Sequence, residues 1–312
     1  MRIVTFSVLG DARLGIYTDK GVVDLARASA KYSSDGVGRL FSDTRTFLSS
    51  GDVARKLATE LVDAAAEEKP SVSPKDAGSL LSKDLVKLLA PILNPQKIYC
   101  PAANYLAHGN EAGIKPPAIP YIFTKFANAL VGHEAAVIHP KIVKRMDMEA
   151  ELAVIIGKRG KDIPASKVFG YIAGYTALND VSFRDLQNEP GWPKVMNPYG
   201  QNWVKGKALD TACPLGPWIV TRDELGEPYP LRIIGRQNGK VIQQGSTKEM
   251  VHNVQELVSY LSQGVTLEPG DVIATGVPAR VPAKERKYLS VGDVVEVEIE
   301  RIGTLRNHIV AE

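Results

Sequence analysis

The chain has 312 residues, of which 44% are hydrophobic and 23% charged, enough for one large domain or two unequal ones. The 38 basic and 35 acidic residues are mixed along the sequence and leave a net charge of +3, so nothing indicates a nucleic-acid surface. No apolar run has the length of a membrane span, and the first residues lack the pattern of a signal peptide. The two cysteines, Cys100 and Cys213, favour reduced thiols in a cytoplasmic protein, although the sequence leaves a disulfide between them open.

Residues 1–90 are predicted to form a small N-terminal α+β domain. Short strands are expected at residues 1–8, 13–19 and 21–26, and residues 51–66 have a helical pattern. Residues 67–79 contain Pro, Ser and Gly and are typical of a linker. A second and larger domain is therefore expected over residues 91–312.

Strand patterns dominate this second part and are separated only by short turns, which favours a mainly β or α+β fold, a mixed β-roll or barrel-like sheet, over a doubly wound sheet. The expected strands lie in residues 97–100, 121–126, 135–140, 151–157, 170–180, 216–221, 231–237, 240–244, 271–276 and 293–300. Asn238-Gly239 is a strong signal for a two-residue hairpin.

One clear helix is predicted among these strands. Residues 246–249, Ser-Thr-Lys-Glu, have the pattern of a capping box at its start. The apolar residues that follow share one helical face, and Gly264 is expected to end the helix. These residues are Val251, Val254, Leu257, Val258 and Leu261.

Three carboxylates point to a metal site. Glu149 and Glu151 are two residues apart at the start of a strand that is apolar on both faces, so both side chains point the same way into a covered interior. Such carboxylates repel each other and need a cation. Together with Asp180 they offer only oxygen donors, which suits Mg²⁺, Mn²⁺ or Ca²⁺ better than zinc. The alternative is a solvated strand end and an unrelated Asp.

Other sites are not indicated, because the sequence has no nucleophile elbow, P-loop, dinucleotide fingerprint or zinc spacing. Instead, His108 and Glu111 are three residues apart, which on a helical turn places them on one face. A carboxylate on one imidazole nitrogen raises the basicity of the other, so the pair can act as a general base for water. The alternative is a surface histidine beside a chance acid.

Arg184 and Gln187 follow Asp180 by four and seven residues and share its face if the segment is helical. The arginine can clamp a carboxylate, fix a ligand loop or form a structural salt bridge, and the glutamine can donate to a carbonyl oxygen. Lys207 can stabilise an enolate beside a bound dication, or be a surface lysine.

Thr275 and Gly276 end a strand. At such a strand end, the threonine hydroxyl and the backbone N–H of the glycine can bind a carboxylate.

With these residues in place, the chain resembles the fumarylacetoacetate hydrolase family over roughly residues 92–310. The matching stretches are KIYCPAANYLAHGNE, YIFTKFANALVG, MEAELAVIIGK, GYTALNDVSFRDLQ, GKALDTACPLGPWIVT, QGSTKEMVHNVQELVSYLSQGVTLEPGDVIATG and VGDVVEVEIERIGTLRN. The resemblance implies a dimeric mixed β-roll with a small N-terminal domain. It also implies Mg²⁺ or Mn²⁺ on the three carboxylates, a water-activating dyad of His108 and Glu111, and a catalytic Lys207 rather than Lys205.

The same resemblance assigns Arg184, Gln187 and Thr275 to the substrate. Three departures from the family pattern lie where substrate is expected. They are Cys100-Pro101-Ala102-Ala103, the long segment of residues 188–202, and Arg280, which either faces a second substrate carboxylate or lies outside the site. The Gly- and Pro-rich residues 109–120 are expected to close over the site as a lid.

The function expected from this comparison is hydrolysis of a C–C bond in a 2,4-dioxo acid of the acylpyruvate or fumarylpyruvate type. It would proceed through a metal-bound enolate, with a water activated by His108 and Glu111. The same metal site serves the alternative, a decarboxylase, isomerase or lyase of a 2-oxo or 2-hydroxydienoate diacid in aromatic catabolism. A third hypothesis is a β-roll protein without catalytic activity that only binds a small acid or a partner. The expected partners are a small 2-oxo acid and a second copy of the chain, with no nucleic acid and no membrane.

Overall fold

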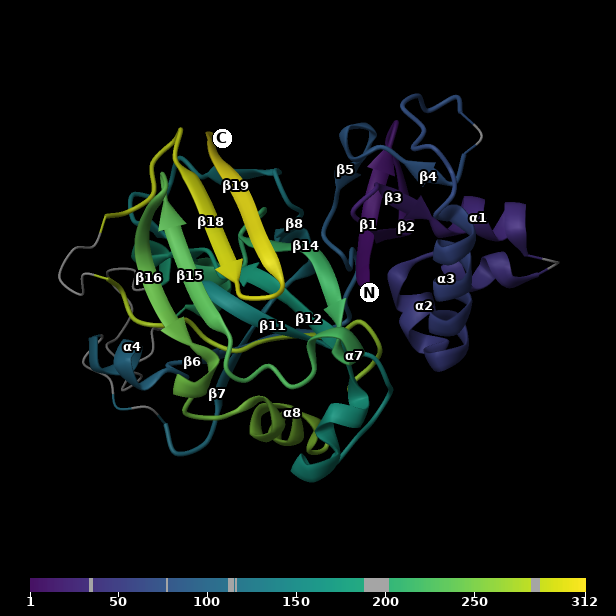
Figure 1. Ribbon diagram of the computed structural model, residues 1–312. Coiled ribbons are helices and arrows are strands. Elements are labelled where there is room, and N and C mark those ends of the chain that lie inside the picture. Colours follow the sequence, from purple (N-terminus) through teal and green to yellow (C-terminus); the bar gives the residue numbers. More distant parts are fainter. Residues whose placement is uncertain (34–35, 77, 112–114, 116, 188–201, 282–286) are drawn as a thin grey trace.

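The structure is a computed structural model. It describes residues 1–33, 36–76, 78–111, 115, 117–187, 202–281 and 287–312, and only the backbone of Glu111. In Figure 1 the N-terminal strands and helices, in purple and blue, lie beside a larger sheet-rich part that contains the C-terminus. No helix within these ranges is long and apolar enough to cross a membrane.

The N-terminal part is a small sheet covered by helices, as expected. Its elements are β1 (Arg2–Val8), β2 (Asp11–Tyr17), β3 (Val22–Asp24), α1 (Leu25–Tyr32), η1 (Val37–Phe41), α2 (Thr44–Ser49), α3 (Gly51–Ala65), β4 (Leu80–Leu81), η2 (Lys83–Leu85) and β5 (Lys87–Leu88). The three predicted strands and the predicted helix at residues 51–66 are confirmed. Asp24 caps α1 by accepting from the Arg27 N–H at 3.1 Å.

Twelve of the described strands form one sheet that runs through both parts of the molecule. Its remaining strands are β6 (Ile98–Ala102), β7 (Tyr121–Lys125), β8 (Leu130–Val131), β11 (Ala150–Ile156), β12 (Ile172–Asn179), β14 (Cys213–Thr221) and β17 (Val272–Ala274). The main path is β4-β3-β2-β1-β14-β12-β11-β17-β6-β7, and β1 pairs antiparallel with β14. The N-terminal unit therefore extends the sheet of the larger part, and a domain boundary at residue 90 stays a prediction.

A second sheet packs on the first, and the core lies between them (Figure 1). Its order is β16 (Lys240–Ser246), β15 (Arg232–Gln237), β18 (Val294–Ile299), β19 (Gly303–Ala311) and β9 (Ala136–His139). Asn238 and Gly239 both have positive φ and form the predicted hairpin between β15 and β16. Every residue of β11 and β12 is buried, as expected for strands covered on both faces. The predicted mixed roll is confirmed, and the described strands do not close into a barrel.

The remaining elements are short. They are α4 (Leu106–Glu111), η3 (Ala127–Ala129), β10 (Met146–Asp147), η4 (Ala165–Tyr171), β13 (Ser182–Phe183), α5 (Arg184–Gln187), α6 (Trp203–Lys207), α7 (Arg222–Leu225), η5 (Thr247–Glu249) and α8 (Val254–Ser262). Several of them sit at the ends of central strands. Their side chains build the site described below.

The predicted start of the long helix was wrong. Ser246 begins only the single turn η5, and α8 starts eight residues later behind Asn253. There Asn253 accepts from the Glu256 N–H and Glu256 accepts from the Asn253 N–H, at 2.9 Å each, which is a complete capping box. The apolar face is confirmed for Val254 and its successors, but Val251 precedes the helix and is exposed.

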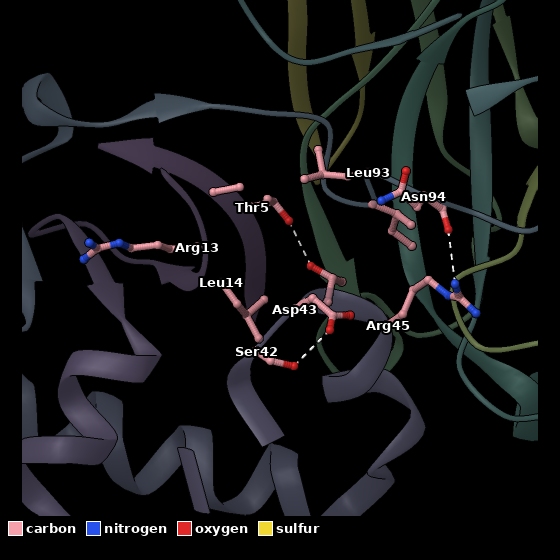
Figure 2. Close-up of a pocket in the computed structure, with 11 residues that line it drawn as sticks. Thr5, Arg13, Leu14, Ser42, Asp43, Arg45, Leu93 and Asn94 are labelled. Atoms are coloured by element: carbon pink, nitrogen blue, oxygen red, sulfur yellow. Dashed lines mark hydrogen bonds between the residues drawn. The ribbon is translucent and has the colours of Figure 1, made fainter. Parts of the chain in front are cut away.

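A pocket of about 320 Å³ lies where the N-terminal unit meets the larger part (Figure 2). Thr5 and Thr44 share a hydrogen bond of 2.9 Å at its wall, and Arg45 donates to the Asn94 carbonyl oxygen at 3.3 Å. Arg45 also donates to the carbonyl oxygen of Pro269, so this one side chain ties α2 to two segments of the larger part. The predicted site residues do not line this pocket.

Candidate active site

Glu149, Glu151 and Asp180 come together as the sequence predicts. One oxygen of each carboxylate lies within 4.8 Å of one oxygen of the other two, and all three residues are buried. Because β11 and β12 pair antiparallel with Ala150 opposite Asn179, the acids at the ends of these two strands meet. The sheet register therefore builds the cluster.

Backbone contacts fix the acids in place. The Asp180 N–H donates to the Glu149 carbonyl oxygen at 2.9 Å, and the Glu149 N–H donates to the side-chain oxygen of Asn179 at 3.0 Å. Gln243 of β16 binds the backbone on both sides of Glu149. It accepts from the Ala150 N–H and donates to the Met148 carbonyl oxygen, at 2.9 Å each. Both sheets thus hold the start of β11.

Two lysines neutralise Asp180, one on each carboxylate oxygen. Lys207 of α6 donates to Asp180 and to Glu149 at 2.6 Å each, and only 1% of its side chain is exposed. Lys125, at the end of β7, donates to the other oxygen of Asp180 at 2.7 Å and to the Val181 carbonyl oxygen at 3.1 Å. Burial acts to lower the pKa of Lys207, but the charges of Asp180 and Glu149 outweigh it and raise the pKa.

Arginines continue this chain of ion pairs. Arg184 binds Glu149 and also donates to one oxygen of Asp147 from Nε at 3.0 Å and from Nη2 at 2.9 Å. Arg280 binds the other oxygen of Asp147 and is itself buried. Burial acts to raise the pKa of Glu149, yet the positive charges of Arg184 and Lys207 hold that pKa well below its usual range.

Glu151 differs from its neighbours, because its carboxylate accepts a hydrogen bond from the Gly276 N–H at 2.7 Å and no described cation pairs with it. Burial raises its pKa well above the usual range, and the negative charges of Asp180 and Glu149 add to the effect. A buried carboxylate beside two others is short of positive charge. This shortage, together with three carboxylate donors, fits a hard divalent cation such as Mg²⁺ or Mn²⁺ on Glu149, Glu151 and Asp180.

The predicted dyad is only half described. His108 and Glu111 both lie in α4, so the helical turn that the spacing requires is present. His108 is half-buried and interacts electrostatically with Glu149, one of the three carboxylates. The side chain of Glu111 lies outside the described residues, as does most of the predicted lid, and the contact between His108 and Glu111 stays a prediction.

The predicted substrate residues surround the acids. Gln187 is buried in α5 and accepts from Arg184 at 3.3 Å, although residues 180–187 are not one helix, because β13 intervenes before α5. The Thr275 hydroxyl donates to the Leu152 carbonyl oxygen at 2.9 Å, and the Gly276 N–H is held by Glu151. Their roles toward a substrate stay predictions, and residues 188–201 lie outside the described part.

Sequence reasoning missed Lys125 and Asp147. Asp147, Glu149 and Glu151 repeat at every second position, and this D-x-E-x-E pattern was a signal for three acids on one strand face. Lys125 is the last residue of β7. Tyr121, Phe123 and Lys125 occupy every second position and therefore share one face of this strand. Cys100 and Cys213 are buried and free, in keeping with the reduced thiols expected.

Comparison with known proteins decides the family. A model described as "Fumarylacetoacetate (FAA) hydrolase C-terminal" matches residues 97–310. The chain belongs to the fumarylacetoacetate hydrolase family. It is 42% identical over 233 residues to the human protein named "Oxaloacetate tautomerase FAHD2A, mitochondrial", a match that covers 74% of this chain and 72% of the human one.

Two solved structures show the same likeness across the whole molecule. A fumarylacetoacetate hydrolase from psychrophilic Exiguobacterium antarcticum is 32% identical with a TM-score of 0.75, and the match covers 100% of both chains. A 5-carboxymethyl-2-hydroxymuconate delta-isomerase from Mycobacterium smegmatis is 29% identical with a TM-score of 0.71 and equally complete coverage. Within the fumarylacetoacetate hydrolase family, then, this chain is similar both to hydrolases and to isomerases.

Proposed function

We propose that the chain is a divalent-metal-dependent tautomerase that interconverts the keto and enol forms of a 2-oxo dicarboxylic acid of the oxaloacetate class. The observation that carries the proposal is Lys207, a buried ammonium held between Glu149 and Asp180 at 2.6 Å from each. A fixed cation beside a metal-binding cluster is suited to stabilise negative charge on an enolate oxygen. The similarity to a protein named oxaloacetate tautomerase supports the same reaction.

The charge of the site supports a dianionic substrate. The described acids and cations of the site number four each, so their formal charges cancel, and Glu151 is the one acid that no described cation pairs with. The acids are Asp147, Glu149, Glu151 and Asp180, and the cations are Lys125, Arg184, Lys207 and Arg280. A divalent cation adds two positive charges to this neutral set, and a dicarboxylate restores the balance.

The proposed reaction needs no outside reactant. The C–H bond at carbon 3 breaks, its electron pair forms the C2–C3 double bond, and the oxygen of the 2-oxo group receives the negative charge and then a proton. His108 is the group assigned to take the proton from carbon 3, and Lys207 donates a hydrogen bond to the developing oxyanion. A divalent cation on Glu149, Glu151 and Asp180 supplies Lewis acidity toward the 2-oxo acid.

The test is the rate at which the enol of oxaloacetate converts to the keto form, followed by ultraviolet absorbance with Mg²⁺, with Mn²⁺ and with a chelator. Lys207→Met should remove metal-dependent turnover. Lys205→Met, a change of an exposed lysine in the same helix, should leave it within about twofold of the parent. Absence of any metal-dependent acceleration in the parent chain, at any tested oxaloacetate concentration, would overturn the proposal.

Hydrolysis of a C–C bond in an acylpyruvate or fumarylpyruvate is the second candidate, and one observation favours it. His108 interacts electrostatically with Glu149 and sits three residues before Glu111 in α4, the spacing that a water-activating dyad needs. A panel of acylpyruvates and fumarylpyruvate separates the two reactions, because only hydrolysis releases pyruvate. The homodimer and the cytoplasmic location remain parts of the proposal, and the human relative is named mitochondrial.

A further inference from the structure

Two elements approach Asp180 with the same pair of residue types. On β7, Phe123 and Lys125 are two residues apart and share a strand face. In α6, Trp203 and Lys207 are four residues apart and share a helix face. Both lysines donate to Asp180. Each of these lysines therefore shares a face of its own element with an aromatic residue.

The two rings pack on each other. The planes of Phe123 and Trp203 are 12° from parallel, with ring centroids 4.4 Å apart. Tyr121, two residues before Phe123 on β7, leans against Trp203 with centroids 6.1 Å apart. The Lys207 ammonium lies 5.1 Å from the centre of the Phe123 ring, within cation–π range. Phe123 is only 7% exposed, so this ring shields the ammonium from water.

Burying Trp203 in this packing leaves one of its polar groups without a hydrogen bond. The indole N–H of Trp203 is buried and has no hydrogen-bond partner in the described structure. An unpaired buried donor costs free energy, and a phenylalanine or leucine would fill part of the space without it. A reason to keep the large indole ring despite this cost is that its flat face packs against the Phe123 ring.

We propose that Phe123 and Trp203 are positioning residues for Lys207. The stack holds the ammonium against the two carboxylates by cation–π attraction and by excluding water, and it locks α6 to β7. Lys207 therefore keeps a fixed direction toward the oxyanion of the enolate. This proposal rests on the proposed function for the role of Lys207 in turnover, but the geometry that it describes can be measured without turnover.

The first measurement is the NMR signal of the lysine side-chain ammonium groups in the metal-free full chain. The Lys207 signal, identified by its loss in Lys207→Met, should be shifted by the Phe123 ring current and protected from exchange. Phe123→Leu should abolish both effects, and Phe123→Tyr should keep them. An unchanged Lys207 signal in Phe123→Leu would overturn the positioning role, whatever reaction the enzyme catalyses.

The second measurement is turnover of oxaloacetate enol. Phe123→Leu and Trp203→Leu should lower kcat about tenfold with KM changed less than twofold, the scale expected for a desolvated cation–π contact. Phe123→Tyr and Trp203→Phe should restore most of the activity, and they serve as folded substitutes if the leucine variants do not fold.

The matched control is Trp218→Phe. The Trp218 ring packs at a tilt against Tyr17 with centroids 4.6 Å apart, and Arg2 lies 5.5 Å from its centre, so these ring contacts are with the N-terminal unit and not with the acid cluster. This control should leave kcat unchanged. A kcat loss in Phe123→Leu no larger than in Trp218→Phe would contradict the proposal. An inactive parent chain with the expected NMR changes would instead reject the proposed function and leave the positioning intact.

Discussion

Lys125 and Asp180 form an ion pair of 2.7 Å deep inside the protein, where no more than 1% of either side chain is exposed. Removing one partner of a buried pair costs about 3–5 kcal/mol when the other charge is left alone. Asp180 would keep Lys207 at 2.6 Å, so we expect Lys125→Met to lower the free energy of unfolding of the metal-free chain by about 3 kcal/mol, the lower end of this range, as measured by urea denaturation.

The control for this change is Lys97→Met, since Lys97 pairs with buried Asp271 at 2.8 Å but is itself 21% exposed. Water can replace part of that interaction, so the loss should be clearly smaller. Equal losses of unfolding free energy in the two variants would show that Asp180 depends on its lysine no more than Asp271 does.

Glu151→Gln should abolish stabilisation by metal without weakening the metal-free fold. Burial and the charges of Asp180 and Glu149 already disfavour the ionised form of Glu151, so a neutral side chain of the same shape relieves repulsion. Thermal unfolding with and without Mn²⁺ checks both parts. The parent should gain stability with Mn²⁺ and the variant should not, while Glu296→Gln on β18 should behave as the parent. A variant that still responds to Mn²⁺ would place the metal elsewhere.

Arg280→Met distinguishes the two roles that the sequence left open for this arginine. Arg280 pairs with buried Asp147, which also pairs with Arg184, so we expect the change to lower the free energy of unfolding by about 3 kcal/mol. Because Arg184 also binds Glu149, a shift of Arg184 should move Glu149 and weaken Mn²⁺ binding. The ratio of kcat/KM for a dicarboxylic over a monocarboxylic 2-oxo acid should stay constant. A selective loss of the dicarboxylic substrate would instead put Arg280 on its second carboxylate.

Glu68 should make the stability of the N-terminal unit depend on pH. Burial acts to raise its pKa, but hydrogen bonds from Ser79, Tyr32 and Lys31 lower it to about 2. A lowered pKa means that the group stabilises the fold above its usual pKa of 4.5, and that this contribution is lost as pH falls toward 2.

The difference in unfolding free energy between the parent and Glu68→Gln measures this contribution. The difference should be constant above pH 4.5 and should shrink below it. A difference that stays the same down to pH 2 would show that these contacts do not depend on the charge of Glu68.

The sequence alone predicted the features that depend on local periodicity. The run of apolar residues after Glu151 predicted a strand covered on both faces, and Asn238-Gly239 predicted a hairpin, because each pattern reflects backbone geometry within a few residues. The acid triad was found in the same way, since two of its members are neighbours on one strand. The start of the long helix was missed because Ser246 and Asn253 both begin plausible capping boxes, and packing of the chain selected the second.

Only the tertiary structure decided which charges meet. Lys125 and Lys207 are 82 positions apart in sequence, and no local pattern says that both reach Asp180. Likewise, the pairing of β1 with β14 joins residues more than two hundred positions apart and merges the N-terminal unit into the central sheet. Such contacts depend on strand order and register, which long-range packing fixes. Local residue patterns specify the strands themselves, and the acids at their ends, but not their neighbours.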